Sequence, residues 1–559
     1  MSTTPDPRLV RHDEARADRY LQSGSWSYQP TIARFRAVAQ MHRTRPAVSG
    51  LDGEMTYEVL DARSDQIAAW LIDNGLPASE AVIVQAGNSA ETVLAFYALL
   101  KAGAVPVAAL PAHRSHEIGH IGRIVRPSGH LVDTGVSDGV LIDLARDHAS
   151  ACPSVQHLLT VGPAPEGFVR LADVGREIAP AAARARVDTV QLGIDHRDVA
   201  VFQLSGGTTG TPKVIPRLHA EYWNNALVNS LVLNRDWRSR TAHAMPILHN
   251  AGVVNALFGA HSVGGCVVPL PFADPDTAVT ALAAAAVTDM MIISPMEPWF
   301  DHPRWRDVAA TLQFLIYSGS KPPKKVVERI AAQNIWMGQT WGMAEGPYTT
   351  TRFAAPPELR AVAVGTPTFD ADDETLVVDP VTLTPVPTGE VGMLAYRGPS
   401  TIAGYFDAAE HNATAFHDGF LLTGDMARVI SHAGLPYVVL EGRIKDVISR
   451  GGEKISTEEV EKLLRQHPAV KDAAVVAMPD RRLGERACAY VSLADPAAPI
   501  QLADVKRHFT ALGVAKYKWP ERLEILDALP RTATLKIDKV TLRRRIAEAI
   551  AAETAHVTV

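Results

Sequence analysis

The chain has 559 residues, of which 47% are hydrophobic and 21% charged, and its formal net charge is -6 at pH 7. This length is too great for a single hydrophobic core and predicts several domains, whereas the acidic balance argues against a general nucleic-acid-binding protein. No apolar run is long enough to span a membrane, and the charged N-terminus lacks the apolar core of a secretory signal. With three cysteines far apart in sequence, we expect a cytoplasmic protein in a reduced compartment.

Helical patterns alternate with short apolar runs in the first third of the chain. The pattern predicts a helix over 57–73, a strand over 81–85, a helix over 90–102 and a strand over 103–110. Such alternation is typical of parallel βαβ units. It resumes after residue 200, with helices expected over 221–231 and 253–263 and strands expected over 267–270 and 290–294.

The pattern of expected secondary structure changes after about residue 360. Short strands are expected over 376–378, 392–396 and 437–440, among turns rich in Gly, Pro and Asp, and they predict a β subdomain. A compact αβ pattern follows, in which Ser456 and Glu459 have the spacing of a capping box and residues 473–478 form a strand.

The predicted fold class is therefore α/β. We expect a large N-terminal domain (residues 1–444) with two α/β subdomains and a β subdomain, followed by a small α+β C-terminal domain (residues 445–559).

A loop rich in glycine and threonine carries the clearest chemical signal. Residues 204–213 contain three glycines and four hydroxyl residues, end in Lys213 and follow a predicted buried strand over 200–204. Bare backbone N–H groups form an anion-binding concavity, and glycine lets the backbone approach closely. A Walker A loop is excluded because Lys213 follows proline and precedes valine. The segment taken alone is also compatible with an ordinary turn.

Six further segments follow this loop in a fixed order: 339–345, 365–367, 423–425, 441–446, 450–455 and 530–537. Together they resemble the adenylate-forming superfamily of acyl- and aryl-CoA synthetases, luciferases and peptide-synthetase adenylation domains. Residues 110–118, 204–217, 246–250 and 478–486 are most similar to stand-alone aryl-acid AMP ligases of siderophore and related pathways, such as 2,3-dihydroxybenzoate and salicylate ligases.

The resemblance implies an enzyme that uses ATP and Mg²⁺. The residues that it assigns to ATP are Ser205, Gly206, Gly207, Thr208, Thr209, Gly210, Lys213, Gly319, Gly338, Gln339, Trp341, Asp425 and Arg443. Within this set, the loop and Lys213 would hold the β- and γ-phosphates, and Asp425 would accept both ribose hydroxyls. Glu345 would be the magnesium ligand, because one carboxylate with phosphate oxygens and waters suits this ion.

Three residues are predicted to be catalytic. Thr340 would touch the α-phosphate, His249 would border the substrate carboxylate, and Lys536 would bridge that carboxylate and the α-phosphate. Leu535 departs from the family, which usually has glycine before this lysine, and we expect leucine to avoid the backbone conformations open to glycine. Lys445 occupies the position of the family's hinge, which implies a mobile C-terminal domain.

Simpler roles remain open for several of these residues. Taken singly, Glu345 suits a helix N-terminus, Asp425 a turn and Lys536 a solvated basic tail. His249 and Asn250 together suit a loop that caps a helix.

The resemblance also assigns an aryl-acid pocket, made by Asn250, Ala251, Asn255, Ser318, Gly319 and Gly342. The amide of Asn250 can donate and accept, so an ortho hydroxyl or an ortho amine would fit. Ala251 and Asn255 replace the aromatic residue and the serine of dihydroxybenzoate ligases. We therefore expect a roomier or more polar pocket, with Asn255 meeting an extra polar group, as in 3-hydroxyanthranilate.

The predicted function is adenylation of an ortho-hydroxy or ortho-amino aryl acid, such as salicylate, 2,3-dihydroxybenzoate or a 3-hydroxyanthranilate-like acid. The aryl-AMP would pass to the phosphopantetheine thiol of a carrier protein in trans, to CoA or to another nucleophile, and no nucleic acid or membrane is expected as a partner. The alternatives are an aliphatic acyl-CoA synthetase and, outside enzymes, a degenerate nucleotide-binding protein.

Overall fold

The computed structural model describes residues 6–136, 139–205, 212–271, 273–443, 446–450, 453–480, 483–512, 514, 516–532 and 535–557. The chain divides into two compact units. Unit 1 comprises Met1–Gly207, Thr211–Glu374 and Tyr396–Leu421, and unit 2 comprises Thr208–Gly210, Thr375–Ala395 and Leu422–Val559. The domain boundary at 444/445 stays a prediction, and Ile444 and Lys445 lie outside the described residues.

Unit 1 contains a seven-stranded sheet. Its strands, in spatial order, are β7 (Val169–Arg170), β6 (His157–Val161), β5 (Gly129–Asp133), β3 (Ala81–Gln85), β4 (Val105–Ala108), β8 (Val199–Leu204) and β9 (Val214–Leu218). Strands β3 to β6 pair in parallel, which confirms the predicted βαβ units. Strand β9 pairs antiparallel with β8, so these two strands flank the glycine-threonine loop.

A nine-stranded sheet completes the framework of unit 1. Its spatial order is β16 (Thr366–Pro367), β15 (Tyr348–Thr350), β14 (Trp336–Gly342), β13 (Phe314–Ser318), β12 (Asp289–Ile292), β10 (Arg240–His243), β11 (Cys266–Pro269), β1 (Pro46–Gly50) and β2 (Gly53–Thr56). The strands β10 to β14 pair in parallel, whereas β15 turns back antiparallel to β14. The turn between β14 and β15 carries Glu345.

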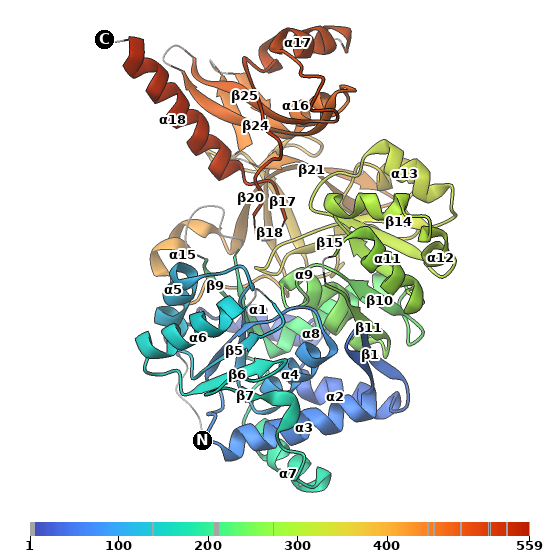
Figure 1. Cartoon of the computed structure of the whole chain (residues 1–559), viewed down its shortest axis with the longest axis vertical. Coiled ribbons are helices and arrows are strands. Elements are labelled where there is room, and N and C mark those ends of the chain that lie inside the picture. Colours follow the sequence, from blue (N-terminus) through green and yellow to red (C-terminus); the bar gives the residue numbers. More distant parts are fainter. Residues whose placement is uncertain are drawn as a thin grey trace. The chain divides into compact units, whose positions relative to one another are not determined.

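Helices surround these two sheets (Figure 1). Those of unit 1 are α1 (Glu14–Ser23), α2 (Thr31–Met41), α3 (Tyr57–Asp73), α4 (Ala90–Lys101), α5 (Ser115–Val125), α6 (Val140–Ala151), α7 (Pro180–Gln191), α8 (His219–Val232), α9 (Asn250–Gly252), α10 (Phe258–Ser262), α11 (Pro275–Ala284), α12 (Trp305–Ala309), α13 (Lys324–Ala331), α14 (Pro357–Arg360) and α15 (Ala409–Ala415). The largest apolar core joins α3, α4, α8 and α10 to strands of both sheets, and Tyr97, Trp223 and Phe258 lie within it. Burial of such large apolar side chains is the main favourable contribution to folding.

The helix predicted over 253–263 has a break in its regularity. Val253–Leu257 (η3) is a π-helical turn, and α10 follows it directly. The prediction of a single regular helix is therefore corrected. A π-helical turn within a helical segment is rare and is frequent at functional sites. Here it contains Asn255, one of the predicted pocket residues.

A third sheet has the spatial order β17 (Glu374–Val378), β18 (Gly392–Arg397), β20 (Phe420–His432) and β19 (Phe416–His417), and β21 (Leu435–Arg443) pairs with β20. It corresponds to the predicted β subdomain. None of the helices in the described part of the chain combines the length and apolar composition needed to cross a bilayer.

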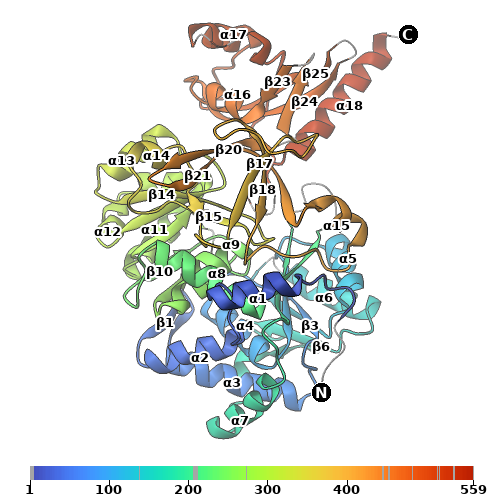
Figure 2. The same ribbon diagram turned by 180° about the vertical axis from the view of Figure 1, so that it is seen from behind.

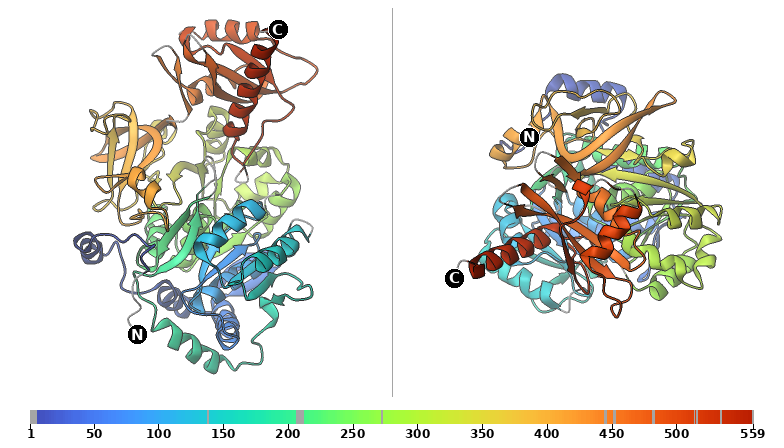
Figure 3. Two further views of the ribbon diagram at one scale, coloured as in Figure 1. Left: turned by 90° about the vertical axis from the view of Figure 1, so that its left-hand side faces the viewer. Right: turned by 90° about the horizontal axis from the view of Figure 1, so that it is seen from above.

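Unit 2 contains a separate five-stranded sheet with its own helices. The spatial order is β23 (Glu453–Ser456), β22 (Val447–Arg450), β25 (Gly484–Leu493) and β24 (Val470–Asp480), and β26 (Arg522–Ile525) pairs with β25. Helices α16 (Thr457–Leu464) and α18 (Lys539–Val557) contact β24, and α17 (Leu502–Ala511) adds to the same core. Figures 2 and 3 show α18 running along the strands of this sheet. Ser456 caps α16 by accepting a hydrogen bond from the Glu459 amide, which is the serine half of the predicted capping box.

Candidate active site

The glycine-threonine loop begins and ends at a closed hairpin base. The Ser205 amide donates to the Lys213 carbonyl (3.1 Å), and the Lys213 amide donates to the Ser205 hydroxyl (3.0 Å). Gly206, Gly207, Thr208, Thr209 and Gly210, which were predicted to bind phosphate, lie outside the described residues. The ends of the loop are thus held together at the edge of the seven-stranded sheet.

Tyr405 connects Lys213 with Glu345. The Lys213 ammonium lies 5.1 Å from the centre of the Tyr405 ring, and the Tyr405 hydroxyl donates to Glu345 Oε1 (2.8 Å). Asn412 holds the Tyr405 backbone through two hydrogen bonds, of 2.8 and 2.9 Å. The structure therefore brings two predicted ATP-site residues, 132 positions apart in sequence, to one buried aromatic side chain.

Burial and the neighbouring Glu345 carboxylate raise the pKa of Tyr405, so its hydroxyl stays protonated and keeps donating. Glu345 is 6% exposed, lies in the turn after β14 and does not begin a helix. Its Oε2 atom has no hydrogen-bond or ion-pair partner among the described residues. A buried carboxylate with one oxygen committed and the other available suits Mg²⁺, which takes oxygen ligands and usually keeps several waters.

Asn250 lies at the start of α9 and is 3% exposed. Its Oδ1 accepts from Arg217 Nη1 (2.6 Å) and from the Tyr222 hydroxyl (3.0 Å), and its Nδ2 donates to the Met343 carbonyl (2.9 Å). The predicted ability of this amide both to donate and to accept is thus already partly used within the chain.

A buried ion pair holds the arginine of this network. Arg217 has a fully buried side chain, and its Nε and Nη2 atoms donate to the two carboxylate oxygens of Glu221 at 2.9 and 2.8 Å. Burial alone would lower the pKa of Arg217, but the Glu221 carboxylate more than offsets this and raises it. Arg217 lies on β9 and Glu221 in the first turn of α8, so the ion pair spans the junction between this strand and this helix.

A predicted catalytic residue, His249, and a predicted pocket residue, Ala251, flank Asn250. His249 caps α9 through a 3.4 Å hydrogen bond from the Ala251 amide to its Nδ1, which agrees with the simpler capping role. Ala251 is half-buried and packs against an apolar cluster that includes Phe314. The role of His249 beside a substrate carboxylate stays a prediction.

Asn255 is buried and hydrogen-bonded within the chain. Its Nδ2 donates to the Ala251 carbonyl (3.1 Å) and to the Tyr348 hydroxyl, and its Oδ1 accepts from Asn229 Nδ2 (3.2 Å). Because both amide hydrogens have partners, only a lone pair on Oδ1 is left for a further polar group. Its predicted contact with a ring substituent stays a prediction.

The remaining predicted residues of unit 1 lie on two adjacent strands. Ser318 ends β13 and pairs with Thr340 on β14, so Gln339, Thr340 and Trp341 follow one another beside it. The Thr340 hydroxyl donates to the Thr349 carbonyl (2.6 Å). Its predicted contact with the α-phosphate stays a prediction.

Two predicted glycines of this region have distinct structural reasons. Gly319 follows β13 with φ +81°, a left-handed conformation that favours glycine. Gly342 ends β14 so close to the Tyr348 ring that a Cβ there would lie 2.5 Å from it. Larger residues at either position would disturb the ends of these two strands.

Asp425 belongs to unit 2 and is 4% exposed. Its amide donates to the Thr423 hydroxyl (3.1 Å), which itself donates to the Leu394 carbonyl (2.7 Å). Arg443 pairs with Asp425 across the β20–β21 ladder. The structure thus brings the two predicted ribose-binding positions to adjacent strands.

Lys536 lies in an exposed turn of unit 2 before α18. Leu535 has φ +64°, so the expectation that leucine avoids the left-handed region was wrong. This conformation costs on the order of 1–2 kcal/mol for an L-residue with a side chain. Hydrogen bonds hold it: the Leu535 amide donates to the Thr532 carbonyl (2.9 Å), and Arg531 Nη1 donates to the Leu535 carbonyl (3.0 Å).

Sequence reasoning did not identify Tyr405, Arg217, Glu221 or Tyr222 as functional candidates. The opposite charges of Arg217 and Glu221, close together in sequence at the start of a predicted helix, are a weak signal that could have suggested the ion pair. For Tyr405 the sequence carries no comparable signal, because Glu345 lies 60 residues away.

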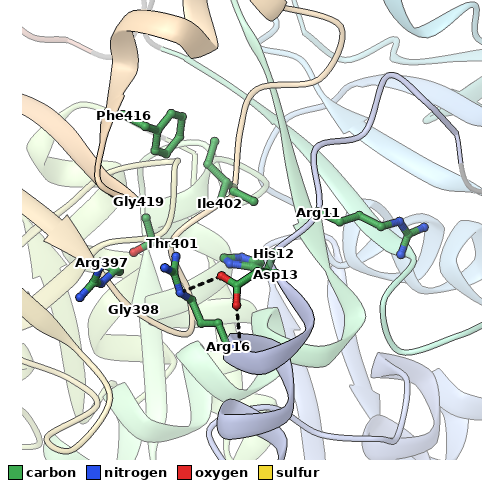
Figure 4. A pocket seen from close by; sticks show the side chains of 11 residues that line it. Arg11, His12, Asp13, Arg16, Arg397, Gly398, Thr401, Ile402, Phe416 and Gly419 are labelled. Atoms are coloured by element: carbon green, nitrogen blue, oxygen red, sulfur yellow. Dashed lines mark hydrogen bonds and ion pairs between the residues drawn. The ribbon is translucent and has the colours of Figure 1, made fainter.

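A cavity of about 210 Å³ lies elsewhere in unit 1 (Figure 4). Its lining includes His12, Arg16 and Thr401 and none of the residues predicted for ATP or the aryl acid. Burial lowers the pKa of His12 to about 4. The adjoining Ile402 amide donates to the Glu345 carbonyl (2.9 Å), so the cavity borders the segment that supports the predicted metal ligand.

Comparison with known proteins identifies the same regions. Residues 35–406 match the model of AMP-binding enzymes, and residues 459–536 match that of the AMP-binding enzyme C-terminal domain. A vibriobactin-specific 2,3-dihydroxybenzoate-AMP ligase of Vibrio cholerae is 35% identical over 95% of this chain and 96% of its own length. A salicylyl-CoA synthase / salicylate adenylyltransferase of a Streptomyces species is 38% identical over 94% and 95%.

A solved structure also resembles this chain along most of its length. The apo structure of MbtA from Mycobacterium smegmatis superposes with a TM-score of 0.70 at 34% identity, covering 96% of this chain and 98% of MbtA. This likeness confirms the predicted mixed α/β fold with a large N-terminal and a smaller C-terminal domain. As the resemblance to adenylate-forming enzymes predicted, the chain belongs to the AMP-binding enzyme family.

Proposed function

We propose that this enzyme uses ATP and Mg²⁺ to adenylate an ortho-hydroxy or ortho-amino aryl carboxylic acid, such as salicylate, 2,3-dihydroxybenzoate or a 3-hydroxyanthranilate-like acid. The observation that carries the proposal is the contact of Tyr405 with both Lys213 and Glu345. A phosphate-binding lysine and a metal-binding carboxylate around one side chain form a site for a magnesium triphosphate. The names of the two relatives, which specify aryl acids, support the choice of acid.

The first step would be nucleophilic substitution at phosphorus. A carboxylate oxygen of the acid attacks the α-phosphorus of ATP, the bond to the β-phosphate oxygen breaks, and pyrophosphate leaves with that electron pair. Such a step depends on positioning and charge neutralisation rather than on proton transfer. Lys213 would neutralise the departing phosphates, Glu345 would hold Mg²⁺, and Tyr405 would orient Glu345 by donating to Oε1.

Residues of unit 2 would complete the reaction. Asp425 and Arg443 would bind the ribose, and Lys536 would offset the repulsion between the acid and the α-phosphate. We propose a hinge at Lys445 and a domain boundary at 444/445, so that the C-terminal domain presents different faces to the two half-reactions.

The second step would transfer the aryl group to a thiol. The thiolate attacks the carbonyl carbon of the aryl-AMP, and AMP leaves to give a thioester. We propose the phosphopantetheine arm of a carrier protein, supplied in trans, as the acceptor. CoA is the second candidate, because one relative is named a salicylyl-CoA synthase.

Exchange of labelled pyrophosphate into ATP tests the proposal. Purified enzyme with Mg²⁺ and a panel of benzoate, salicylate, 2,3-dihydroxybenzoate, anthranilate, 3-hydroxyanthranilate and aliphatic acids should show exchange with ring acids. Exchange with aliphatic acids only would favour the aliphatic acyl-CoA synthetase, and no exchange with any acid would leave a degenerate nucleotide-binding protein. Thioester formation with CoA and with an aryl carrier protein then identifies the acceptor.

A further inference from the structure

The cavity beside α1 has both charged and apolar walls, and all of its lining belongs to unit 1. The lining comes from residues within 11–16, which lead into α1, and from residues within 397–419. Its volume of about 210 Å³ is smaller than the roughly 300–1,000 Å³ typical of sites for drug-sized ligands. The cavity therefore suits a molecule the size of a small organic acid rather than a nucleotide.

Arg16 brings a guanidinium with unused donors to this cavity. Its side chain is 24% exposed and forms an ion pair with Asp13, in which Nε lies 3.4 Å from Oδ2. Its Nη1 and Nη2 atoms make no hydrogen bond to any described residue. Gly419 leaves space for them, because a Cβ there would lie 3.0 Å from both. The N–H donors of these two nitrogens, with their positive charge, are thus available to a ligand.

Arg397 lines the same cavity, but its donors are already used. Its Nε and Nη2 donate to the two carboxylate oxygens of Glu374 (3.0 and 2.6 Å), and its Nη1 donates to the Asp418 carbonyl (2.9 Å). Asp13 is the only carboxylate among the described residues of the lining, and it caps α1 by accepting from the Arg16 amide (2.9 Å). Positive charge therefore exceeds negative charge in the lining, and Arg16, unlike Arg397, still has hydrogen bonds to make.

Two buried polar atoms of the lining also lack partners. Thr401 is 3% exposed, and its Oγ1 has no hydrogen-bond partner in the described part of the chain. The same holds for Nδ1 of His12. Burial lowers the pKa of His12 to about 4, so this imidazole is neutral at pH 7 and the charge of the cavity comes from its arginines. Because nearly all buried polar groups in native proteins are paired, these atoms indicate a bound molecule that supplies their partners.

Another part of the lining is apolar. Ile402 is 6% exposed, and Phe416 packs against the same small apolar cluster. In Figure 4 both lie on one side of the Arg16 guanidinium, whereas Arg11 points away from it. A guanidinium beside a hydrocarbon surface favours a carboxylate with an apolar body over inorganic phosphate, which would leave that surface uncovered.

We propose that this cavity is a binding site for a small organic acid. Arg16 and Thr401 hold its carboxylate, and its apolar body lies against Ile402 and Phe416. The inference goes beyond the proposed function, because none of the lining residues was predicted for ATP or for the aryl acid.

Two contacts connect this cavity to the proposed magnesium ligand. The Ile402 amide donates to the Glu345 carbonyl (2.9 Å). The centre of the Phe416 ring lies 6.4 Å from that of Tyr405, whose hydroxyl donates to Glu345 Oε1. An acid that packs on Ile402 and Phe416 thus contacts both supports of Glu345. Its binding should therefore change the Mg²⁺ requirement of the enzyme, because two sites that share such contacts influence each other's affinity.

Saturation-transfer NMR and calorimetry on the full chain test the site with cyclohexanecarboxylate, which has a carboxylate and a ring but is not an aryl acid. It should bind, whereas cyclohexanecarboxamide, which lacks the charge, and acetate, which lacks the ring, should bind at least about tenfold more weakly. No binding of cyclohexanecarboxylate would overturn the proposal. Equal binding of the carboxamide would overturn the role of the guanidinium, and equal binding of acetate or inorganic phosphate would overturn the apolar contact.

Two variants place the bound acid in the cavity. Arg16→Met should weaken binding by about tenfold or more, and it keeps the backbone amide that Asp13 accepts. Thr401→Val should weaken binding by about three- to tenfold without loss of stability, since the hydroxyl that it removes has no partner in the described part of the chain. Thr401→Val therefore decides the matter if Arg16→Met does not fold.

The matched control is Arg123→Met, which removes an exposed arginine of α5 and should leave binding unchanged. Binding that persists at full strength in both cavity variants would lie elsewhere on the chain and would overturn the proposal.

Pyrophosphate exchange tests the connection to the magnesium site. Cyclohexanecarboxylate should change the Mg²⁺ concentration needed for half-maximal exchange by at least about twofold in the wild-type enzyme and in Arg123→Met, but not in Arg16→Met. No change in the wild-type enzyme would overturn the connection, and so would an equal change in Arg16→Met, which would indicate competition at the active site.

The two proposals fail in different ways. The binding measurements need neither ATP nor activity, so they decide the cavity site even if no acid supports exchange. Absence of exchange with every acid would overturn the proposed function, whereas absence of binding to the cavity would overturn this inference.

Discussion

Asn250 in unit 1 and Lys536 in unit 2 are both predicted to meet the acid, but their surroundings differ. Asn250 is 3% exposed and makes three hydrogen bonds to its own chain. Lys536 is exposed in a turn that contains a left-handed leucine. The candidate residue of unit 1 is thus held in place by its own chain, whereas the candidate lysine of unit 2 relies on a backbone turn to place a flexible side chain.

The largest effect is expected at Lys536, the exposed residue of this comparison. Lys536→Met removes the charge that we propose offsets repulsion between the acid and the α-phosphate, and exchange activity should fall by about a hundredfold or more. Thioester formation from chemically prepared aryl-AMP should change much less. Lys471→Met, at an exposed position on β24, is the control. Equal loss in both half-reactions would contradict the assigned role.

Glu345→Gln tests the proposed magnesium ligand, which is a buried residue of unit 1 like Asn250. Gln keeps the size and an oxygen for Tyr405 but lacks the charge that attracts Mg²⁺, so exchange should fall by about tenfold to a hundredfold. A titration of Mg²⁺ should show that more metal is needed for half-maximal activity. Glu358→Gln, at an exposed position on α14, should leave the titration unchanged. An unchanged metal requirement in Glu345→Gln would exclude this residue as the ligand.

Tyr405→Phe separates the two contacts of the Tyr405 side chain, one made by its hydroxyl and one by its ring. It removes the hydrogen bond to Glu345 and retains the ring beneath Lys213. The loss of one hydrogen bond to a charged group should raise the Mg²⁺ requirement by about tenfold, with a smaller effect on KM for ATP. Tyr405→Leu, which also removes the ring, should raise the KM for ATP further. Should both variants behave alike, the ring contact with Lys213 has no role.

The smallest effect is expected at Leu535. Glycine relieves a left-handed conformation that costs on the order of 1–2 kcal/mol, but it loses more backbone freedom on folding, roughly 0.5–1 kcal/mol. Leu535→Gly should therefore raise the free energy of unfolding by at most about 1.5 kcal/mol and change exchange activity less than about twofold. Leu535→Ala, which keeps the strained conformation, is the control. Denaturant unfolding and exchange assays measure both, and a large gain in activity would show that the leucine restrains Lys536.

Much of the fold could be predicted, because its signals are local. The helix over 57–73 and the strand over 81–85 have the predicted bounds, and alternation of such elements led to the parallel sheet. The π-helical turn at 253–257 could not be predicted, since the period of the apolar residues in this segment is that of an ordinary helix and gives no signal for it.

The sequence by itself determined the family and the positions of most candidate residues, because glycine, lysine and carboxylate chemistry is carried by residue type and order. Only the tertiary structure decided which polar atoms of those residues already have hydrogen-bond partners within the chain. Arg217 and Asn250 are 33 positions apart, and Tyr405 and Glu345 are 60 apart. Whether an amide donates or accepts depends on such distant partners, and no local pattern encodes them.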